Sequence, residues 1–113
     1  DKDELPWYVY GKNISKNEIY VCQGVDNQLL YTENITLNNI HWINKLKKFK
    51  NLDCLVQIRH RHKPVKCNIE FNEGFRVMFQ EEIRGVAPGQ SAVFYKDNLC
   101  LGGGVIEARN NDL

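Results

Sequence analysis

The stretch QIRHRHKPVK, residues 57–66, holds the side chains best suited to binding chemistry. On an extended strand, Arg59 and Arg61 lie on one face, and His60 and His62 lie on the other. Guanidinium groups suit phosphate oxygens, and imidazoles can stack on bases or bond to ribose. The stretch therefore predicts contact with nucleic acid; the alternative is an exposed basic strand without a ligand. A third metal ligand at useful spacing is absent, so the histidine pair predicts no metal site.

The charge distribution supports a polyanionic partner. The net charge is only +1, but residues 45–66 contain eight basic residues and one acid, Asp53, and so carry +7. The other residues include seven basic and thirteen acidic ones and carry −6. A locally basic segment in a neutral chain can attract nucleic acid, and a solvated lysine-rich linker is the alternative.

The glycine run in LGGGVIEAR, residues 101–109, raises the question of a phosphate-binding loop. Such a loop needs G-x-x-x-x-G-K-[ST] between a strand and a helix, whose N-terminal amides surround the phosphate. No lysine or hydroxyl follows these glycines. Gly102, Gly103 and Gly104 are therefore expected to form a bulge or a close backbone crossing in a strand. No cofactor is expected to bind this chain.

No residue set resembles a catalytic site. Ser15 and Ser91 are the only serines, and neither lies in a G-x-S-x-G turn. Glu81 and Glu82 are adjacent, so on a strand they point to opposite faces and cannot act as a pair. The chain by itself is therefore expected to be non-catalytic.

The chain has four cysteines: Cys22, Cys54, Cys67 and Cys100. They lie among alternating apolar residues and form no C-x-x-C pair, which favours four buried thiols in a reducing cytoplasm. A disulfide or a zinc site is the alternative. No apolar run approaches the roughly 18 residues of a membrane span, so we expect a cytoplasmic protein without a membrane partner. The chain starts at Asp1 and its only methionine is Met78, so we expect a piece of a longer protein.

Strand patterns dominate the chain, and no helical period is sustained. Residues 37–44, LNNIHWIN, fit a strand or a helical turn, and residues 45–53, KLKKFKNLD, interrupt the sheet pattern. Short strands at close spacing predict a small antiparallel barrel. The expected strands are residues 6–13, 18–24, 29–35, 54–64, 66–71, 75–80, 90–95 and 99–109.

Several of these segments together resemble one enzyme family. APGQSAVFYKDNLCLGGGVI, residues 87–106, is similar to the C-terminal signature of the bacterial and mitochondrial tRNA-specific 2-thiouridylases. PWYVYGKN and IHWIN resemble segments of that family's central region, and IRHRHKPVKC resembles its R-Y-R-x-x-x-x-x-C strand. The resemblance covers nearly the whole chain.

The resemblance implies a place in a larger enzyme, which puts sulfur at position 2 of the wobble uridine of certain tRNAs. In that family a PP-loop domain binds ATP with magnesium and adenylates the C2 oxygen, and a cysteine persulfide supplied by a sulfur donor protein delivers sulfur. None of these catalytic motifs occurs in this chain, and its four cysteines do not match the catalytic positions. The expected partners are the tRNA anticodon arm, the PP-loop domain and the donor protein.

The resemblance also implies a fold and a domain division. Residues 1–44 correspond to the end of a small β central domain, and residues 45–53 to a basic linker. Residues 54–109 correspond to a C-terminal β-barrel that resembles domain 2 of translation elongation factors. Residues 110–113 form a tail. The whole chain is thus expected to be all-β.

Three residues inherit tRNA contacts from the resemblance: Arg59, His60 and Gln90. His60 stands where the family commonly has tyrosine, so it offers less area for stacking. Arg61 is added because it shares a strand face with Arg59. For Gln90 the alternative is that its amide caps the turn and serves folding. For the whole chain the alternatives are a free-standing RNA-binding barrel, or a module that supports the catalytic domain without touching RNA.

Overall fold

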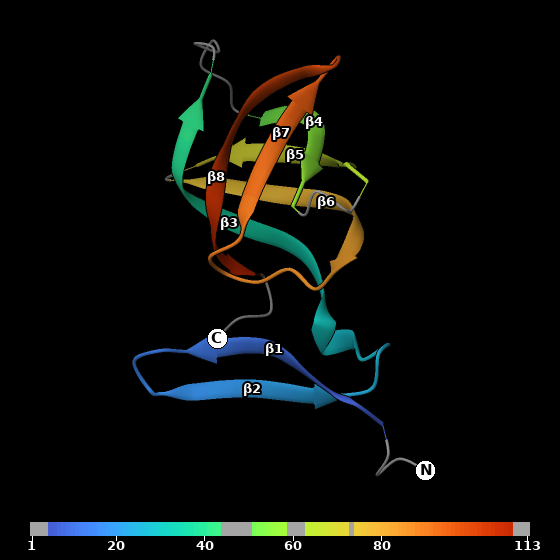
Figure 1. The fold of residues 1–113 in the computed structure, drawn as a ribbon. Helices are drawn as coiled ribbons and strands as arrows, with labels where there is room; N and C mark the ends of the chain where they lie inside the picture. The colour runs from blue at the N-terminus through green and yellow to red at the C-terminus, as the bar shows by residue number, and fades with distance from the viewer. Residues whose placement is uncertain (1–4, 44–50, 59–62, 73, 110–113) are drawn as a thin grey trace.

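A computed structural model describes residues 5–43, 51–58, 63–72 and 74–109. These residues form a two-stranded hairpin and a closed barrel, arranged one below the other in Figure 1. The hairpin pairs β1 (Trp7–Asn13) with β2 (Glu18–Gln23). A short 3-10 turn, η2 (Gln28–Leu30), leads from the hairpin into the barrel. No helix in this described part is long and apolar enough to cross a membrane.

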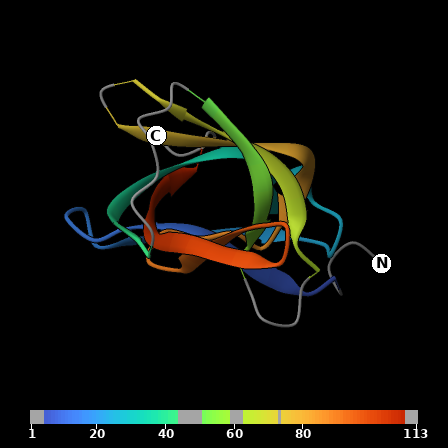
Figure 2. The same cartoon turned by 90° about the horizontal axis from the view of Figure 1, so that it is seen from above.

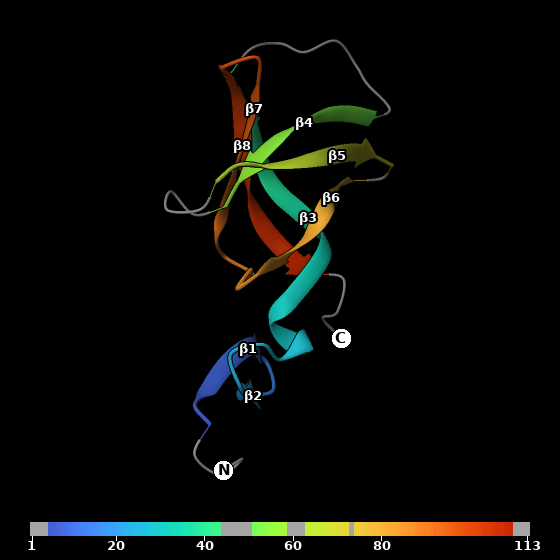
Figure 3. The ribbon, with the colours of Figure 1, turned by 90° about the vertical axis from the view of Figure 1, so that its right-hand side faces the viewer.

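Six antiparallel strands form the barrel, in the order β3-β6-β5-β4-β7-β8 and back to β3. The view from above in Figure 2 shows them as a ring. The side view in Figure 3 shows the strands that form the barrel wall, at different inclinations. The predicted all-β class and the predicted barrel are therefore confirmed. The strands are β3 (Tyr31–Trp42), β4 (Asn51–Gln57), β5 (Val65–Phe71), β6 (Phe75–Arg84), β7 (Ser91–Lys96) and β8 (Leu99–Arg109).

The barrel encloses one apolar core because alternate residues of each strand point inward. Phe94, Ile35, Ile69, Ile106 and Val77 are at most 1% exposed. On β4 the inward residues are Cys54 and Val56, and on β6 the inward residue is Val77. Burial of these side chains is the main force that holds the six strands together.

The barrel begins earlier in the chain than the sequence predicted. β3 falls within the range 1–44 that was assigned to the preceding domain, yet it pairs with β6 and β8 and closes the barrel. The pairing with β8 shifts register between Asn38 and His41, and Asn39 has a φ of 51°. This bulge breaks the period of two, so the sequence of residues 37–44 did not look like the continuation of a strand. β4 likewise starts at Asn51, inside the predicted linker.

A tight turn at Asp97 and Asn98 joins β7 to β8. Asp97 and Asn98 have φ values of 51° and 67°. Positive φ at both central residues is the pattern of a type I′ turn, whose twist matches that of the flanking strands. The turn returns the chain so that the glycine run of β8 lies beside β7.

The three consecutive glycines lie in β8, where it passes between β3 and β7. A Cβ at Gly102 would overlap the main-chain carbonyl oxygen of His41. One at Gly103 would lie 2.7 Å from the carbonyl oxygen of Ala92, and one at Gly104 would lie 2.9 Å from Cγ1 of Ile40. The predicted close backbone crossing is thus confirmed, and the run is not the N-terminus of a helix.

The crossing predicts an unequal response to two alanine substitutions at the same backbone angle. Gly102 and Gly74 have φ values of 149° and 148°, but a Cβ at Gly74 meets nothing within 4 Å. Gly74→Ala should therefore cost only backbone strain, about 1 kcal/mol of unfolding free energy. Gly102→Ala should cost roughly 2 kcal/mol more, because it also forces β3 and β8 apart. Urea unfolding of both variants measures the difference, and equal losses would contradict the crowding at β8.

Candidate nucleic-acid interface

Three of the four residues predicted to bind RNA, Arg59, His60 and Arg61, lie outside the described residues. The structure describes the strand that leads to them. β4 ends at Gln57, which pairs with Val93 of β7, and Ile58 follows in a bend. The strand that precedes Arg59, His60 and Arg61 therefore ends beside the first residues of β7.

Gln90, the fourth predicted residue, stands immediately before β7 and closes a tight turn. Its side-chain Oε1 accepts a hydrogen bond of 3.0 Å from the main-chain N–H of Ala87. Its own main-chain N–H donates to the Ala87 carbonyl at 3.3 Å, and its carbonyl accepts from Ile106 at 2.8 Å. The turn also places Gly89 at a φ of 91°. The amide oxygen of Gln90 thus serves the turn, as the folding alternative supposed.

The remaining chemistry of Gln90 lies in its amide nitrogen. A carboxamide has two N–H donors as well as its oxygen, so one group can cap a turn and donate to a ligand. Gln90 is partly exposed, and the following Ser91 is exposed. The capping and binding alternatives are therefore compatible in this geometry.

The antiparallel pairing of β4 with β7 brings these features to one edge of the barrel. We call the edge formed by Gln57, Ile58, Gln90 and Ser91 the β4–β7 rim. Gln57 and Gln90 are 33 positions apart in sequence, yet Gln57 pairs with a residue only three positions after Gln90. The rim thus brings the end of β4, which directly precedes Arg59, beside the Pro-Gly-Gln turn.

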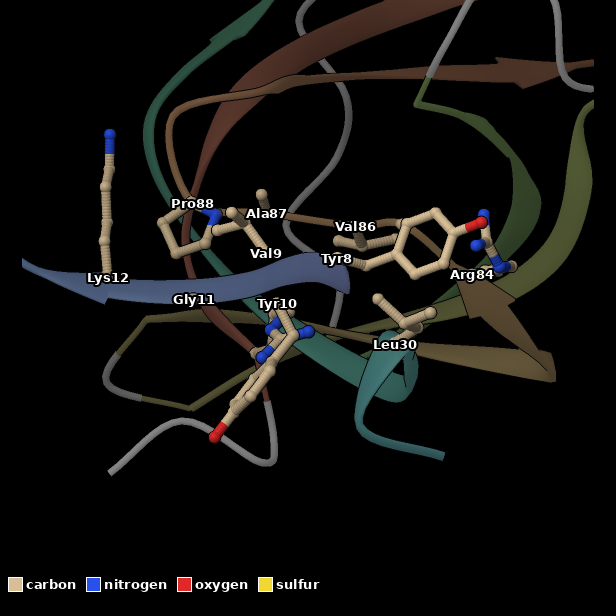
Figure 4. Close-up of a pocket in the computed structure, with 12 residues that line it drawn as sticks. Tyr8, Val9, Tyr10, Gly11, Lys12, Leu30, Arg84, Val86, Ala87 and Pro88 are labelled. Atoms are coloured by element: carbon tan, nitrogen blue, oxygen red, sulfur yellow. The ribbon is translucent and has the colours of Figure 1, made fainter. Parts of the chain in front are cut away.

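A groove of about 390 Å³ lies between the hairpin and the barrel, and Ala87 and Pro88 of the same turn line it. Figure 4 shows Tyr8, Tyr10 and Lys12 of β1 along one wall, with Ala87 and Pro88 nearby. A neighbouring hollow of about 670 Å³ shares Tyr10, Lys12 and Pro88 with it. Pro88, which lies two residues before Gln90, lines both spaces.

Two arginines of the barrel hold the hairpin through its tyrosines. The Arg84 guanidinium lies 5.2 Å from the centre of the Tyr8 ring, and its Nε donates to the Val25 carbonyl at 3.0 Å. The Arg109 guanidinium lies 5.9 Å from the Tyr10 ring and donates to the Leu29 carbonyl at 3.3 Å. A cation over an aromatic face is stabilising, so these contacts fasten the two parts together.

Sequence reasoning missed Arg84 and Arg109. Arg84 lies beyond the expected strand of residues 75–80 and was assigned to no element. The one signal was the alternation of Tyr8 and Tyr10 with apolar residues on β1, which puts both rings on one face. Their partners come from strands more than 70 positions away, and only the fold identifies them.

Catalytic and metal-binding arrangements were not expected, and the described residues offer little for either. Within those residues no three His, Cys, Asp or Glu side chains gather where they could hold a metal ion. The cysteines there are free thiols; three are buried as predicted. Cys100 is only half-buried, which corrects the prediction of four buried thiols.

Comparison with known proteins shows where this fold occurs. Residues 32–106 match the family model described as the aminomethyltransferase beta-barrel domain. The chain is 39% identical over 114 residues to the tRNA-specific 2-thiouridylase MnmA of Idiomarina loihiensis, covering 99% of this chain and 31% of that protein. It is 41% identical over 107 residues to the protein of the same name from Buchnera aphidicola subsp. Acyrthosiphon pisum, covering 93% and 29%.

A third relative, tRNA-specific 2-thiouridylase MnmA of Pseudoalteromonas atlantica, is 40% identical over 105 residues, covering 91% of this chain and 26% of that protein. The chain therefore spans about a third or less of the length of these curated relatives. The resemblance drawn from the motifs is confirmed, and this chain belongs to the aminomethyltransferase beta-barrel domain family and corresponds to part of the tRNA-specific 2-thiouridylases.

Proposed function

We propose that this chain is the part of an ATP-dependent tRNA 2-thiouridylase that binds and positions the tRNA anticodon arm. The observation that carries the proposal is the β4–β7 rim, where the end of β4, directly before Arg59, lies beside the Gln90 turn. The names of the relatives support tRNA as the substrate of the whole protein. The enzyme would act in the cytoplasm, on the wobble uridine.

The chemistry belongs to another part of the enzyme in this proposal. The PP-loop domain would bind ATP with magnesium, and a sulfur donor protein would supply the sulfur. The family description of the barrel names an aminomethyltransferase, whereas the relatives are named thiouridylases. One barrel occurring under two activities is consistent with a binding role, because function lies in sites added to a fold.

The basic segment supplies charge and the turn supplies a directed donor. Arg59 and Arg61 would meet phosphate oxygens, which gives affinity and register without reading sequence. His60 would stack on a base or bond to a ribose, as an imidazole can. The Gln90 amide nitrogen would donate to a base edge or a ribose hydroxyl.

One observation favours a second function, support of a neighbouring domain. The hairpin face turned away from the barrel carries Trp7, Val9, Ile19 and Val21, which are 64%, 62%, 68% and 48% exposed. A contiguous exposed apolar face of this kind is typical of protein contact. In the enzyme, the catalytic part would cover it. The two functions use different surfaces and can coexist.

Removing one arginine should lower the salt dependence of RNA binding. If Arg59 and Arg61 each neutralise a phosphate, Arg59→Ala and Arg61→Ala should each reduce the log-log salt slope by roughly 0.7–0.9. Lys16→Ala, in the exposed hairpin turn, removes the same charge away from the rim and serves as the control. Filter binding of an anticodon stem-loop at several salt concentrations measures the slopes. If Arg59→Ala and Arg61→Ala keep the wild-type slope, as the control Lys16→Ala should, phosphate contact by these two arginines is excluded.

Gln90 should separate capping from binding when two substitutions are compared. Gln90→Glu keeps an oxygen for the Ala87 N–H and removes the donors, so the melting temperature should stay nearly constant while RNA binding weakens by roughly 1–3 kcal/mol. Gln90→Ala also loses the cap and should cost about 1 kcal/mol of unfolding free energy. Thermal unfolding and RNA titration on the same preparations measure both quantities.

The added negative charge of Gln90→Glu needs its own control. Ser91→Asp places a carboxylate on the next residue, which is exposed. A directed contact at Gln90 requires that Gln90→Glu weaken binding more than Ser91→Asp does. Equal losses would mean that charge alone is responsible, and Gln90 would then be a turn cap only.

The chain should not bind ATP tightly by itself. The glycine run lies inside β8 and its amides face neighbouring strands, so they do not form a phosphate cradle. Isothermal titration of ATP with magnesium should show no saturable binding at micromolar concentrations. Such binding would require a nucleotide site in this chain and would contradict the proposal that ATP binds only to the PP-loop domain.

A further inference from the structure

Two cysteines face each other across neighbouring strands of the barrel. Cys54 of β4 and Cys67 of β5 are direct partners in the antiparallel register. Their Sγ atoms lie 3.7 Å apart, within hydrogen-bonding distance for sulfur. Both side chains are largely buried, at 9% and 5% exposure. Neither thiol has a part in the RNA-binding role proposed above.

The backbone geometry suits a covalent link between them. Directly opposite residues of antiparallel strands have Cα atoms about 4.5–5.5 Å apart. Disulfides span Cα separations of about 4.4–6.8 Å. The sulfurs can therefore approach to bonding distance through side-chain rotation, without moving either strand. We propose that Cys54 and Cys67 form a redox-active dithiol, which a small two-electron oxidant such as hydrogen peroxide converts into a reversible disulfide.

The two thiols have unequal reactivity. The hydrogen bond between the two thiols lowers the pKa of Cys54. Burial raises this pKa, the positive charge of Lys96 lowers it and the carboxylate of Asp53 raises it, and the net pKa is lowered. The hydrogen bond to Cys54 and burial both raise the pKa of Cys67. Thiolates, not thiols, attack peroxides. Cys54 is thus the attacking sulfur, and Cys67 is the resolving one.

A hollow in the barrel wall gives a small oxidant access to this pair. It has a volume of about 410 Å³, and its lining includes both cysteines together with Asp53, Lys66 and Met78. It lies where pairing between β5 and β6 begins: Cys67 pairs with Phe79, while β5 residues 65 and 66 pair only with β4. The hollow therefore lies beside the resolving residue, where β5 has no pairing with β6.

The oxidation balances in two steps. The Cys54 thiolate attacks one peroxide oxygen, the O–O bond breaks, and hydroxide leaves with the electron pair, giving a sulfenic acid at Cys54. The Cys67 sulfur then attacks the Cys54 sulfur, the S–O bond breaks, and hydroxide leaves. The proton from Cys67 and one from the solvent convert the two hydroxides into water. Overall, two thiols are oxidised and one peroxide is reduced to two waters.

The bond would close a loop that starts and ends at the barrel wall. The residues between Cys54 and Cys67 include Arg59, Arg61, Lys63 and Lys66. In the cytoplasm, where thiols are kept reduced, such a bond forms transiently and reports oxidative conditions.

Mass spectrometry of the whole 113-residue chain tests the proposal. The chain is treated with about one equivalent of hydrogen peroxide, remaining thiols are blocked with iodoacetamide, and the protein is digested with trypsin without reduction. The expected product is a linked pair of peptides, residues 51–59 and 67–76, in most molecules. Dithiothreitol should separate the pair. Cys22 and Cys100 should carry the blocking group.

Variants of the other cysteines complete the test. The double variant Cys22→Ser, Cys100→Ser should form the same linked pair, whereas Cys54→Ser and Cys67→Ser should form none. In Cys67→Ser the attacking sulfur has no resolving partner, so Cys54 should be trapped as a sulfenic acid by dimedone. The proposal is wrong if Cys54 and Cys67 both stay open to iodoacetamide. It is equally wrong if they link to Cys22 or Cys100, or oxidise to sulfinic acid without linking. None of these readouts depends on RNA binding.

Discussion

The architecture depends on the close approach of three backbones at the glycine run of β8. A barrel of six strands closes only if its last strand can pair with the first and with its own hairpin partner. Here β8 fits between β3 and β7 because Gly102, Gly103 and Gly104 have no side chains to hold these strands apart. The type I′ turn before β8 and the bulge of β3 opposite it adjust twist and register at the same place. The feature that most resembles a nucleotide-binding motif is therefore what closes the barrel.

Closure in turn determines which loops share an edge. Once β7 is held against β8, its other side accepts β4, and the end of β4 arrives beside the Pro-Gly-Gln turn. Gln90 contributes to this arrangement with its main chain and its amide oxygen, while its amide nitrogen would supply the donor that we propose for RNA. A residue with two such tasks links the folding of the rim to the binding that we propose there.

The hairpin is attached differently from the barrel strands. Its contact with the barrel relies on Arg84 and Arg109 over tyrosine rings and on hydrogen bonds to main-chain carbonyls, and two open spaces of about 390 and 670 Å³ lie along the contact. The barrel strands are held instead by one apolar core of buried side chains. The molecule thus combines a rigid binding platform with a hairpin whose outer face is apolar and exposed. This division agrees with an RNA-binding rim on one part and a domain contact on the other.

The sequence by itself determined the strand content, the barrel class, the glycine crossing and the family. All of these depend on local alternation, on backbone angles that particular residues allow, or on a contiguous motif. Only the tertiary structure decided that β3 belongs to the barrel, because the bulge at Asn39 conceals its periodicity. It also decided that Arg84 and Arg109 meet tyrosines, that Gln57 lies near Gln90, and that Cys54 faces Cys67. These contacts join distant segments through the register of paired strands, which depends on how the whole barrel closes and is not encoded in any single stretch of chain.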